Sequence, residues 1–479
     1  MIVSNEKKDL VVMKFGGSCL QNAESFNKTV AIIQNYLKES KLVIICSALK
    51  GVTDKLINFY KKSCEDENDC DYMVESIFNR HKDVVDEIFD DEKPEYSDTI
   101  DFLDENVEEL TQLGRIIRLL RPSSDIQDII ISYGERLSTF IVSQYINSLD
   151  IGIKSQYISS DEIIVTDDNF GRALPLLEET EEKIKEKMVP LIESKMTDIF
   201  CVTGFYGSTE DKKITTLGRG GTDLTAAILA YCLNLNYNSK VVYWKDVPGF
   251  LNADPRISDK TALLKRISYI EAKELAFFGS KVLHPVCLDV NEKRSIPSEI
   301  RPFNDPDSEE FTTITKEMEE EKQIIKAVTS IVKLAMVTIE SGTMVSLPGT
   351  ASKLFSLLGD NNINIKFISQ SSSENNITFG INIEDSMRVS FILRNSDLFG
   401  KQWFSIKIDN DISLIAVIGA GMLHTPGIAG KVFTTLGNNG VNVRAIAQGS
   451  SELNITIIVE RKDCKKAINV LYNAFIDDK

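Results

Sequence analysis

The sequence contains only three histidines, His81, His284 and His424, and they lie far apart. Zinc sites and Ser-His-Asp catalysis both depend on histidine, so this scarcity disfavours those two kinds of active site. The eight cysteines include no Cys-x-x-Cys pair, and several lie inside apolar runs. Such usage is typical of reduced thiols, and we expect a cytoplasmic protein.

Positive charge and long hydrophobic runs are also lacking. Lysine and arginine number 54 against 71 acidic residues, which gives a formal net charge of −17. A nucleic-acid-binding surface needs a basic face, so we expect no nucleic-acid partner. No stretch approaches the roughly 20 apolar residues of a membrane helix, and the first residues show no apolar signal-peptide segment. We therefore expect no membrane association.

The first part of the chain alternates between strand and helix patterns. An apolar run at 10–17, a helical pattern at 25–38 and a second apolar run at 42–48 predict a βαβ unit with parallel strands. Further elements are predicted as strands at 128–135, 154–158, 198–205, 213–217 and 240–244, helices at 136–147 and 270–278, and a loop at 246–260. Everything up to about residue 305 fits one large doubly wound α/β domain, because 479 residues are too many for a single core.

One segment of this region differs from the rest. Residues 54–121 are acidic, nearly free of glycine and helical in pattern. We predict a helical excursion on the sheet.

The last third of the chain repeats itself at an offset of 78 residues. Residues 349–378 and 427–456 are identical at 16 of 30 aligned positions. Each copy is predicted to fold as strand, turn, helix, turn, strand and strand, which is an α+β module. The identities include polar residues near the turns, and core packing alone would preserve only the apolar face. A shared ligand-binding role is therefore favoured over a purely architectural repeat.

The most glycine-rich stretch is Thr215–Asp223, which reads TTLGRGGTD. Its three glycines allow a sharp turn and a close approach to a ligand. Thr222 and Asp223 are suitable N-cap residues for the helix-like segment at 224–231. A helix N-terminus favours anions, and Arg219 adds a cation that suits carboxylate or phosphate. From these residues alone, an anion-binding loop and an ordinary strand-to-helix turn are equally open.

Three other segments share this design, with a predicted strand that ends in glycine or small polar residues: 14–18, 47–53 and 132–135. In a parallel α/β sheet, ligands bind at the carboxyl ends of the strands. We therefore expect all four segments to meet at one crevice. The side chains expected to converge there are Lys14, Ser47, Thr53, Glu135, Arg219 and Asp223.

Six motifs, taken in order, resemble those of aspartate kinases. They are KFGGS at 14–18, SYGERLS at 132–138, VTGFYG at 202–207, TTLGRGGTD at 215–223, DVPGFLNADPR at 246–256 and ELAFFGSKVLHP at 274–285. The likeness continues through the repeat, which resembles paired ACT domains. It implies an amino acid kinase fold over 1–305, with the helical excursion at 54–121, followed by two regulatory ACT domains. These cover 306–400 and 401–479, and the last segment of the second can return to the first.

The resemblance also implies a reaction, the transfer of a phosphoryl group from ATP to the β-carboxylate of L-aspartate. The product would be 4-phospho-L-aspartate, on the route to lysine, threonine and methionine. A carboxylate with a reference pKa of roughly 3.9 is already ionised at neutral pH, so no general base is needed. Positioning and charge neutralisation then dominate, with ATP and Mg²⁺ as cofactors. The homoserine dehydrogenase fused to some members of the family is not expected, so the kinase is expected to be monofunctional.

Individual roles follow from the resemblance. Lys14 would contact the transferring phosphate, Gly16 and Gly17 would offer backbone N–H groups, and Asp223 would organise the lysine cluster or the magnesium ion. The other nucleotide-binding residues implied are Lys245, Asp246, Arg256 and Lys281. The substrate-binding residues implied are Ser47, Thr53, Glu135, Arg219 and Thr222, with Arg219 on a carboxylate of aspartate and Glu135 on its α-ammonium group. No separate metal site in the protein is expected.

Several of these residues also allow plain structural interpretations. Glu135 also suits a helix cap, Lys281 a surface lysine, and 254–256 an ordinary turn. His284 is expected to pack or cap before Pro285 without a catalytic role.

The chain departs from the family pattern at several positions, of which Lys245 and Leu251 lie on the nucleotide loop. Lys245 stands where threonine is usual, Leu251 where tyrosine is usual, and Cys19 where many members have a hydroxyl residue. The contacts with ATP are therefore less secure than those with aspartate. Two alternatives remain open, a kinase of this fold acting on a glutamate-type substrate and a catalytically decayed amino-acid sensor.

The ACT resemblance implies feedback inhibition by an end-product amino acid. The effector-binding residues implied are Met344, Asn364, Gln370, Asn376, Met422, Asn442, Gln448 and Asn454. A Gln-x-Ser-Ser-Glu-x-Asn-Ile pattern occurs in both copies and favours threonine over lysine as the effector. ACT modules commonly pair between chains, so a homodimer or homotetramer is expected.

Overall fold

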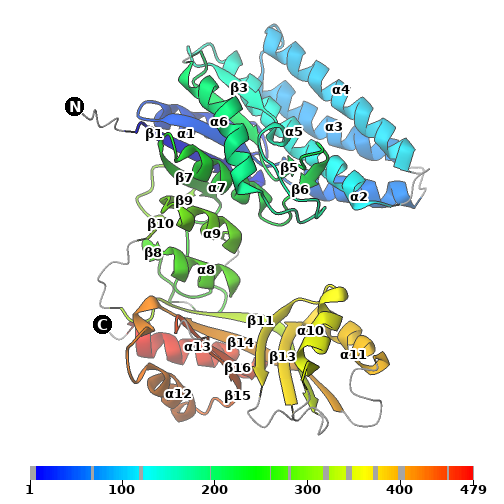
Figure 1. Ribbon diagram of the computed structural model, residues 1–479. Coiled ribbons are helices and arrows are strands. Elements are labelled where there is room, and N and C mark those ends of the chain that lie inside the picture. Colours follow the sequence, from blue (N-terminus) through cyan, green and yellow to red (C-terminus); the bar gives the residue numbers. More distant parts are fainter. Residues whose placement is uncertain are drawn as a thin grey trace. The chain divides into compact units, whose positions relative to one another are not determined.

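The structure is a computed structural model, and its contacts divide the chain into two compact units (Figure 1). The first unit comprises Met1–Gly249, Lys265–Tyr269 and Lys281–Met318, and the second comprises Phe250–Leu264, Ile270–Ser280 and Glu319–Lys479. The residues described are 7–65, 70–117, 122–194, 196–258, 260–278, 282–316, 323–340, 348–370, 376–396, 405–449 and 452–477.

The first unit is built on an eight-stranded sheet with the order β3-β4-β2-β1-β7-β9-β10-β8. Its strands are β1 (Asp9–Phe15), β2 (Lys41–Cys46), β3 (Ser155–Ile158), β4 (Ile199–Thr203), β7 (Asn238–Lys245), β8 (Arg266–Ser268), β9 (Ser298–Pro302) and β10 (Thr312–Thr315). The strand pairs described are parallel, apart from β9 with β10. All of β1 except Asp9 is buried, as expected of a parallel strand covered on both faces. The predicted mainly parallel α/β fold is confirmed.

Four helices follow β2. The first three cover most of the segment predicted as a helical excursion at 54–121, and the fourth comes after it. These are α2 (Val52–Cys64), α3 (Cys70–Ile88), α4 (Pro94–Ile117) and α5 (Ser124–Ser148), which pack in sequence against one another (Figure 1). The other helices of this unit are α1 (Ala23–Leu37), α6 (Leu177–Glu193), α7 (Gly221–Leu233) and α9 (Pro285–Lys293). The predicted helical excursion is therefore confirmed.

The strand predicted at 128–135 is wrong, because these residues lie inside α5. Three successive isoleucines, 129–131, resemble a strand, but a helix that is buried around most of its surface shows no polar face either. Gly134 is needed inside this helix, since a Cβ there would lie 2.8 Å from the Cβ of Ala48. The helix can therefore lie against the segment that follows β2.

The glycine-rich stretch begins in a separate hairpin. β5 (Tyr206–Ser208) and β6 (Ile214–Thr216) pair antiparallel in a two-stranded sheet. α7 starts at Gly221, and its N-cap is Gly220, whose φ of 77° is left-handed. The prediction that Thr222 and Asp223 cap this helix is wrong, since both lie in its first turn.

The second unit contains a six-stranded antiparallel sheet with the order β12-β13-β11-β14-β16-β15. The first copy of the repeat contributes β11 (Ala327–Glu340), α10 (Thr350–Asp360), β12 (Ile365–Gln370), β13 (Asn376–Asn382) and α11 (Ser386–Asn395). The second contributes β14 (Ser405–Ile418), α12 (Ile428–Asn438), β15 (Val443–Ala447), β16 (Asn454–Glu460) and α13 (Cys464–Tyr472). The two copies therefore have the same element order, and the predicted pair of α+β modules is confirmed.

Two segments from the middle of the sequence also belong to the second unit, Phe250–Leu264 and Ile270–Ser280. The amide of Asn252 donates to the hydroxyl of Tyr472 over 3.1 Å. In α8 (Tyr269–Phe277), the carboxylate of Glu271 accepts from the backbone N–H of Ala420 over 3.1 Å. The second unit is therefore discontinuous in the sequence.

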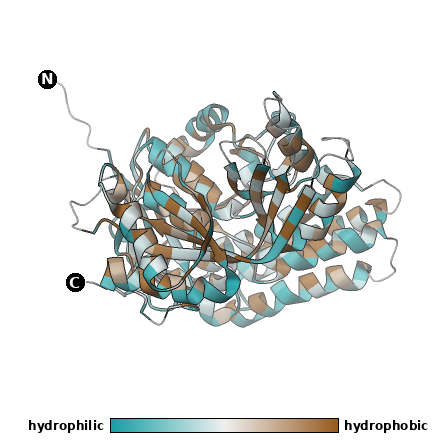
Figure 2. Ribbon diagram, turned by 90° about the horizontal axis from the view of Figure 1, so that it is seen from below, coloured by the Kyte–Doolittle hydropathy of each residue, from teal (hydrophilic) through white to brown (hydrophobic). Residues whose placement is uncertain are grey.

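Hydrophobic residues concentrate in the strands, whereas the long helices alternate between hydrophilic and hydrophobic residues (Figure 2). In the part of the chain that the structure describes, no helix combines the length and the apolar character needed to cross a membrane.

Candidate active site

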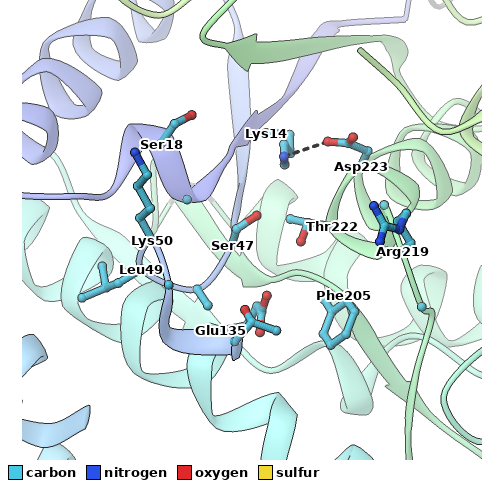
Figure 3. Close-up of a pocket in the computed structure, with 17 residues that line it drawn as sticks. Lys14, Ser18, Ser47, Leu49, Lys50, Glu135, Phe205, Arg219, Thr222 and Asp223 are labelled. Carbon is cyan, nitrogen blue, oxygen red and sulfur yellow. Dashed lines mark ion pairs between the residues drawn. The ribbon is translucent and has the colours of Figure 1, made fainter. Parts of the chain in front are cut away.

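A cavity of about 380 Å³ opens at the carboxyl ends of β1 and β2, beside α5 and the start of α7 (Figure 3). All six side chains that were expected to converge line this cavity. The predicted residues that line it are Lys14, Gly17, Ser47, Thr53, Glu135, Arg219, Thr222 and Asp223. Of the four segments predicted to meet here, 14–18 begins at the end of the parallel strand β1 and 47–53 follows the parallel strand β2. The segment 132–135 lies in α5, and 215–223 begins in the β5–β6 hairpin. Convergence was thus predicted correctly, although the supporting elements were not.

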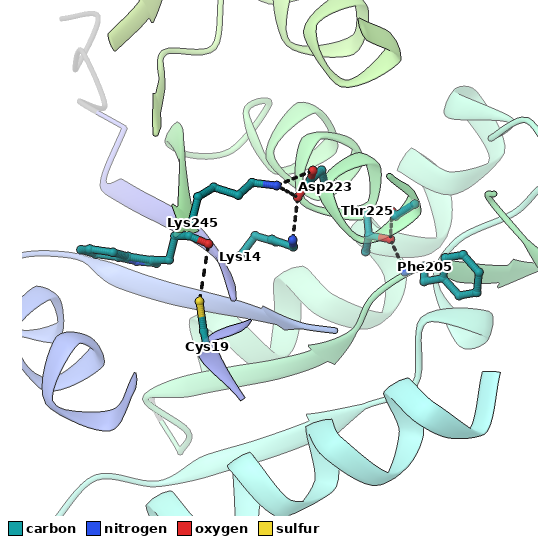
Figure 4. Close-up of polar contacts among 8 residues, drawn as sticks. Lys14, Cys19, Phe205, Asp223, Thr225 and Lys245 are labelled. Carbon is teal, nitrogen blue, oxygen red and sulfur yellow. Dashed lines mark hydrogen bonds and ion pairs between the residues drawn. The ribbon is translucent and has the colours of Figure 1, made fainter. Parts of the chain in front are cut away.

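Asp223 lies between two lysines (Figure 4). Its Oδ1 is 2.8 Å from Nζ of Lys14, and Nζ of Lys245 lies 2.9 Å from Oδ1 and 2.7 Å from Oδ2. Asp223 and Lys14 are buried, with exposures of 5% and 6%. One buried and one partly buried cation therefore share one carboxylate, which leaves this cluster with a net positive charge when all three groups are ionised.

The two lysines differ in their proton affinity. Burial by itself raises the pKa of Asp223, but the charges of Lys14 and Lys245 outweigh it and hold that pKa at about 2. Burial also disfavours charged Lys14, yet the charge of Asp223 outweighs it, and the pKa of Lys14 lies above its usual value. For Lys245, burial and the neighbouring Lys14 charge prevail over the attraction of Asp223, so its pKa is lowered.

Gly16 and Gly17, which follow β1, allow the backbone to pass close to the Lys14–Asp223–Lys245 cluster. A Cβ at Gly16 would lie 3.2 Å from Nζ of Lys14, and one at Gly17 would lie 3.0 Å from the carbonyl oxygen of Ala48. The missing side chains therefore let the turn lie beside the ammonium group and against the segment after β2.

Glu135 is a buried carboxylate that faces the cavity with only 3% exposure. Burial raises its pKa to about 8, against the opposing effect of the Ala48 backbone amide and the charge of Lys14. Its Oε2 has no hydrogen-bond partner among the described residues. A buried acceptor without a donor is costly, so the site is suited to a ligand that brings a cationic donor.

Arg219 is an exposed cation of the cavity, as is Lys50, and it forms no ion pair with the residues the structure describes. It lies between Gly218 and Gly220, whose φ angles of 72° and 77° are left-handed. The ring of His284 occupies the space beside Gly220, where a Cβ would lie 2.6 Å from the Cβ of His284. His284 thus packs against the loop, as its structural interpretation predicted.

Phe205 and Lys50 line the cavity but were not predicted as site residues. Phe205 has a φ of 76°, which is rare for a bulky residue and marks a constrained position. Its N–H donates to Oγ1 of Thr225 over 3.0 Å, a contact drawn in Figure 4. The signal in the sequence was the VTGFYG motif, but no pattern in it shows which way the aromatic ring points.

The remaining nucleotide-binding predictions lie elsewhere. Asp246 is exposed and does not line the cavity. Arg256 belongs to a segment of the second unit and pairs with Asp254 over 2.7 Å. Lys281 lies outside the described residues. The thiol of Cys19 lies 3.6 Å from the carbonyl oxygen of Trp244 and is buried, so here it packs against the strand that carries Lys245.

A second cavity, of about 470 Å³, lies in the six-stranded sheet where β12 and β15 approach each other. Of the predicted effector residues it is lined by Gln370, Gln448 and Asn454. The side-chain amide of Asn454 also forms a hydrogen bond with the carboxylate of Glu274 on α8 over 2.5 Å. The two repeats thus contribute jointly to one cavity.

The other effector predictions are not gathered there. Met422 is buried in a hydrophobic core, Asn364 and Asn442 are exposed before their strands, and Asn376 begins β13. Met344 lies outside the described residues. Among the described residues, no group of three or more histidine, cysteine, aspartate or glutamate side chains is placed to hold a metal ion.

The amino acid kinase family model matches residues 9–302, and the ACT domain model matches 337–395 and 415–475. A bifunctional aspartokinase/homoserine dehydrogenase 2 of Arabidopsis thaliana is 30% identical over 477 residues, which are 97% of this chain and 50% of that protein. Aspartokinase 3 of the same plant is 29% identical over 98% of this chain and 82% of its own length. The chain thus spans about half the length of the first of these curated relatives.

Solved structures of aspartokinases share the fold. The aspartate kinase of Clostridium acetobutylicum matches with a TM-score of 0.75 and 28% identity, over 98% of this chain and 100% of that one. E. coli aspartokinase III in complex with aspartate and ADP matches with a TM-score of 0.80 and 24% identity, over 97% and 99%. With its kinase sheet, its paired ACT modules and these matches, the chain belongs to the amino acid kinase family and has the domain composition of aspartokinases.

Proposed function

We propose that the protein is an aspartate kinase that transfers the γ-phosphoryl group of ATP to the β-carboxylate of L-aspartate. The carboxylate oxygen forms a bond to the γ-phosphorus while the bond from that phosphorus to the bridging oxygen breaks, so that ADP leaves. The observation that carries the proposal is that two separate groups of charged side chains lie at one cavity. Lys14 lies beside Lys245 and Asp223, whereas Glu135 and Arg219 are left to bind the amino acid.

The charges in this cavity suit the two substrates. The Lys14–Asp223–Lys245 cluster attracts the nucleotide phosphates and stabilises charge that develops during transfer. Glu135 accepts the α-ammonium group of aspartate, which supplies the missing partner of Oε2. Arg219 binds a carboxylate, a group that its planar guanidinium recognises well. Ser47, Thr53 and Thr222 add hydroxyl groups around the amino acid.

Magnesium is proposed to enter with ATP, bound to its phosphates. Asp223 is the buried carboxylate nearest to the phosphate end, and both its oxygens already contact lysine. Of the two roles implied for Asp223, organisation of the lysines therefore has structural support. A Mg²⁺ ion that keeps several waters and binds substrate phosphates needs few protein ligands.

The comparisons support this choice of substrate over a glutamate-type one. The relatives named aspartokinase match along nearly the whole chain, including both ACT modules. One neighbour of the same fold was solved with aspartate and ADP, the pair of ligands proposed here. The sensor alternative is disfavoured because Lys14, Glu135, Arg219 and Asp223 are all present around one cavity.

The proposal is tested by incubating the protein with MgATP and one amino acid, and trapping any acyl phosphate with hydroxylamine. The candidates are aspartate, glutamate and N-acetylglutamate. Hydroxamate formed only with aspartate is the expected result. Product with glutamate alone would favour the alternative substrate, and product with none of the three would favour the sensor.

For regulation, we propose that an end-product amino acid binds the cavity lined by Gln370, Gln448 and Asn454 and lowers kinase activity. Threonine is favoured over lysine, although one fold neighbour was solved with lysine and aspartate. Inhibition requires that the effector bind the less active state more tightly. Titration of threonine and lysine against activity distinguishes them, and activity unchanged by both would contradict this part of the proposal.

Three further expectations remain proposals. A homodimer or homotetramer is expected from the ACT modules, and analytical ultracentrifugation would measure it. A single activity is expected, which an assay for homoserine dehydrogenase would test. A cytoplasmic location would be tested by fractionation.

A further inference from the structure

Asp128 is a buried carboxylate that faces away from solvent on α5, with 1% exposure. It accepts three hydrogen bonds from two segments distant in sequence. Its Oδ2 accepts from the backbone N–H groups of Gly171 and Thr216, both over 2.8 Å, and its Oδ1 accepts from the hydroxyl of Thr216 over 2.7 Å.

Both segments support the loop that carries Arg219. Thr216 ends β6, three residues before Arg219. The turn at Gly171 lies under Gly218, where a Cβ would be 3.1 Å from the carbonyl oxygen of Gly171. A further hydrogen bond, from the N–H of Ala173 to the carbonyl oxygen of Thr216 over 2.9 Å, joins the two segments. Asp128 therefore fixes the base of the Arg219 loop.

The same helix carries Glu135, seven residues further on. Seven residues make about two turns of an α-helix and a rise of about 10 Å, so both side chains lie on one face. α5 is buried along most of this stretch, which keeps it rigid. The rigid helix α5 thus places Glu135 at the cavity and, through Asp128, holds the loop that carries Arg219.

We infer that Asp128 is a positioning residue that sets the distance between Glu135 and Arg219, and thereby the length of the amino acid that the cavity accepts. This inference rests on the proposed roles of those two residues. Loss of its hydrogen bonds lets the Arg219 loop shift relative to α5, which weakens aspartate binding and allows a substrate one methylene longer. The phosphate end, built on β1, β7 and the first turn of α7, keeps its own contacts.

The experiment compares Asp128→Asn with Asp125→Asn, which makes the same change of charge one turn earlier on α5. The hydrogen bond described for the carboxylate of Asp125 is with the backbone N–H of its neighbour Ile126. For Asp128→Asn the KM for aspartate is expected to rise about tenfold, because a neutral amide oxygen accepts the two backbone N–H groups more weakly than the ionised carboxylate does. The KM for ATP is expected to stay within about twofold, and the preference for aspartate over glutamate is expected to fall. Asp125→Asn is expected to leave all three quantities unchanged.

Thr216→Val keeps both backbone N–H groups and removes only the hydroxyl contact, so a smaller rise in the aspartate KM, about threefold, is expected. It also provides the measurement if Asp128→Asn does not fold. A purely structural role would lower stability and the active fraction, and so lower kcat without changing the KM for aspartate. An unchanged aspartate KM in the folded variants would therefore overturn the inference. Failure of the proposed function is recognised separately, because the unsubstituted protein would then phosphorylate no aspartate.

Discussion

The two cavities of this protein differ in how they hold charge. In the first unit, Lys14, Glu135 and Asp223 are buried and their pKa values are shifted. In the second unit, the cavity is lined largely by amide, hydroxyl and apolar groups, and Gln370 and Gln448 are exposed. Buried, preorganised charge is what stabilises a redistribution of charge in a reaction. Neutral amides can recognise an amino acid without such a cost, which suits a site that senses and does not react.

The sharpest test of this difference is the removal of a buried charge from the first cavity. Lys14→Ala is expected to lower kcat/KM by about 10² or more, because it removes a preorganised cation and leaves Asp223 with one lysine. Steady-state kinetics with the hydroxamate assay measures it. Lys8→Ala, an exposed lysine just before the same strand, is the control and is expected to be neutral. Near-normal turnover of Lys14→Ala would show that the phosphate site is elsewhere.

The next largest effect is expected at the amino-acid end. Glu135→Gln keeps the shape but cannot ionise when the ammonium group of aspartate binds, so the KM for aspartate is expected to rise by about 10- to 100-fold, the range for a hydrogen bond to a charged group. The KM for ATP should change much less. Equal effects on both substrates would contradict the assignment of Glu135 to the ammonium group.

The same residue links activity to stability. Its pKa of about 8 in the folded protein exceeds the ordinary glutamate value of 4.5, so the folded state holds a proton that the unfolded state has lost between these two pH values. The free energy of unfolding contributed by Glu135 therefore falls as the pH rises from about 4.5 to about 8. Glu135→Gln removes this decline and is expected to be more stable than the unsubstituted protein at pH 8, by an amount that shrinks toward pH 4.5. Urea unfolding of the ligand-free proteins at several pH values measures the difference, and a difference independent of pH would contradict it.

Lys245 tests whether the second lysine matters for the nucleotide. Lys245→Thr restores the residue usual in the family, and Lys245→Met keeps the length without the charge. Both are expected to raise the KM for ATP, or to lower kcat, by about tenfold, since the cluster with Asp223 loses its net positive charge. Because the pKa of Lys245 is lowered, this contribution is expected to fade at high pH before that of Lys14 does. Full activity of Lys245→Met would show that this lysine is only structural.

The smallest effect is expected in the second cavity. Gln448→Ala is expected to raise the effector concentration for half-inhibition by about threefold to tenfold and to leave the uninhibited rate unchanged. Asn395→Ala, an exposed amide on α11 outside the cavity, serves as the control. A change in the uninhibited rate without a change in inhibition would contradict the proposal that the second cavity binds an effector and takes no part in the reaction.

Much of the fold could be predicted because its signals are local. The apolar runs of β1 and β2, the glycine turns and the two copies of the repeat all describe elements that the structure confirms. The segment at 128–135 was wrongly predicted as a strand, since successive β-branched residues in a helix that is buried around most of its surface do not show helical periodicity. The residues that converge in the first cavity were predicted from motifs together with strand ends, although two of their four supporting elements were not parallel strands.

What escaped prediction depends on contacts between distant segments. Three contacts join residues that are far apart in sequence. They are the hydrogen bond from the N–H of Phe205 to Thr225, the ion pair of Lys245 with Asp223, and the hydrogen bonds that Asp128 accepts. No spacing in a single sequence encodes such pairings. For the same reason, the sequence showed that both repeats carry polar turns but not that Gln370 and Gln448 line a shared cavity.

The discontinuity of the second unit has a consequence for how the chain is made and dissected. Phe250–Leu264 and Ile270–Ser280 leave the ribosome before the strands on which they pack, so their apolar surface waits for later-synthesised partners. A fragment ending near residue 305 would keep those segments without their partners, and a fragment starting there would lack Asn252 and Glu271. Expression of the two halves is thus best attempted together, as complementing pieces of one chain.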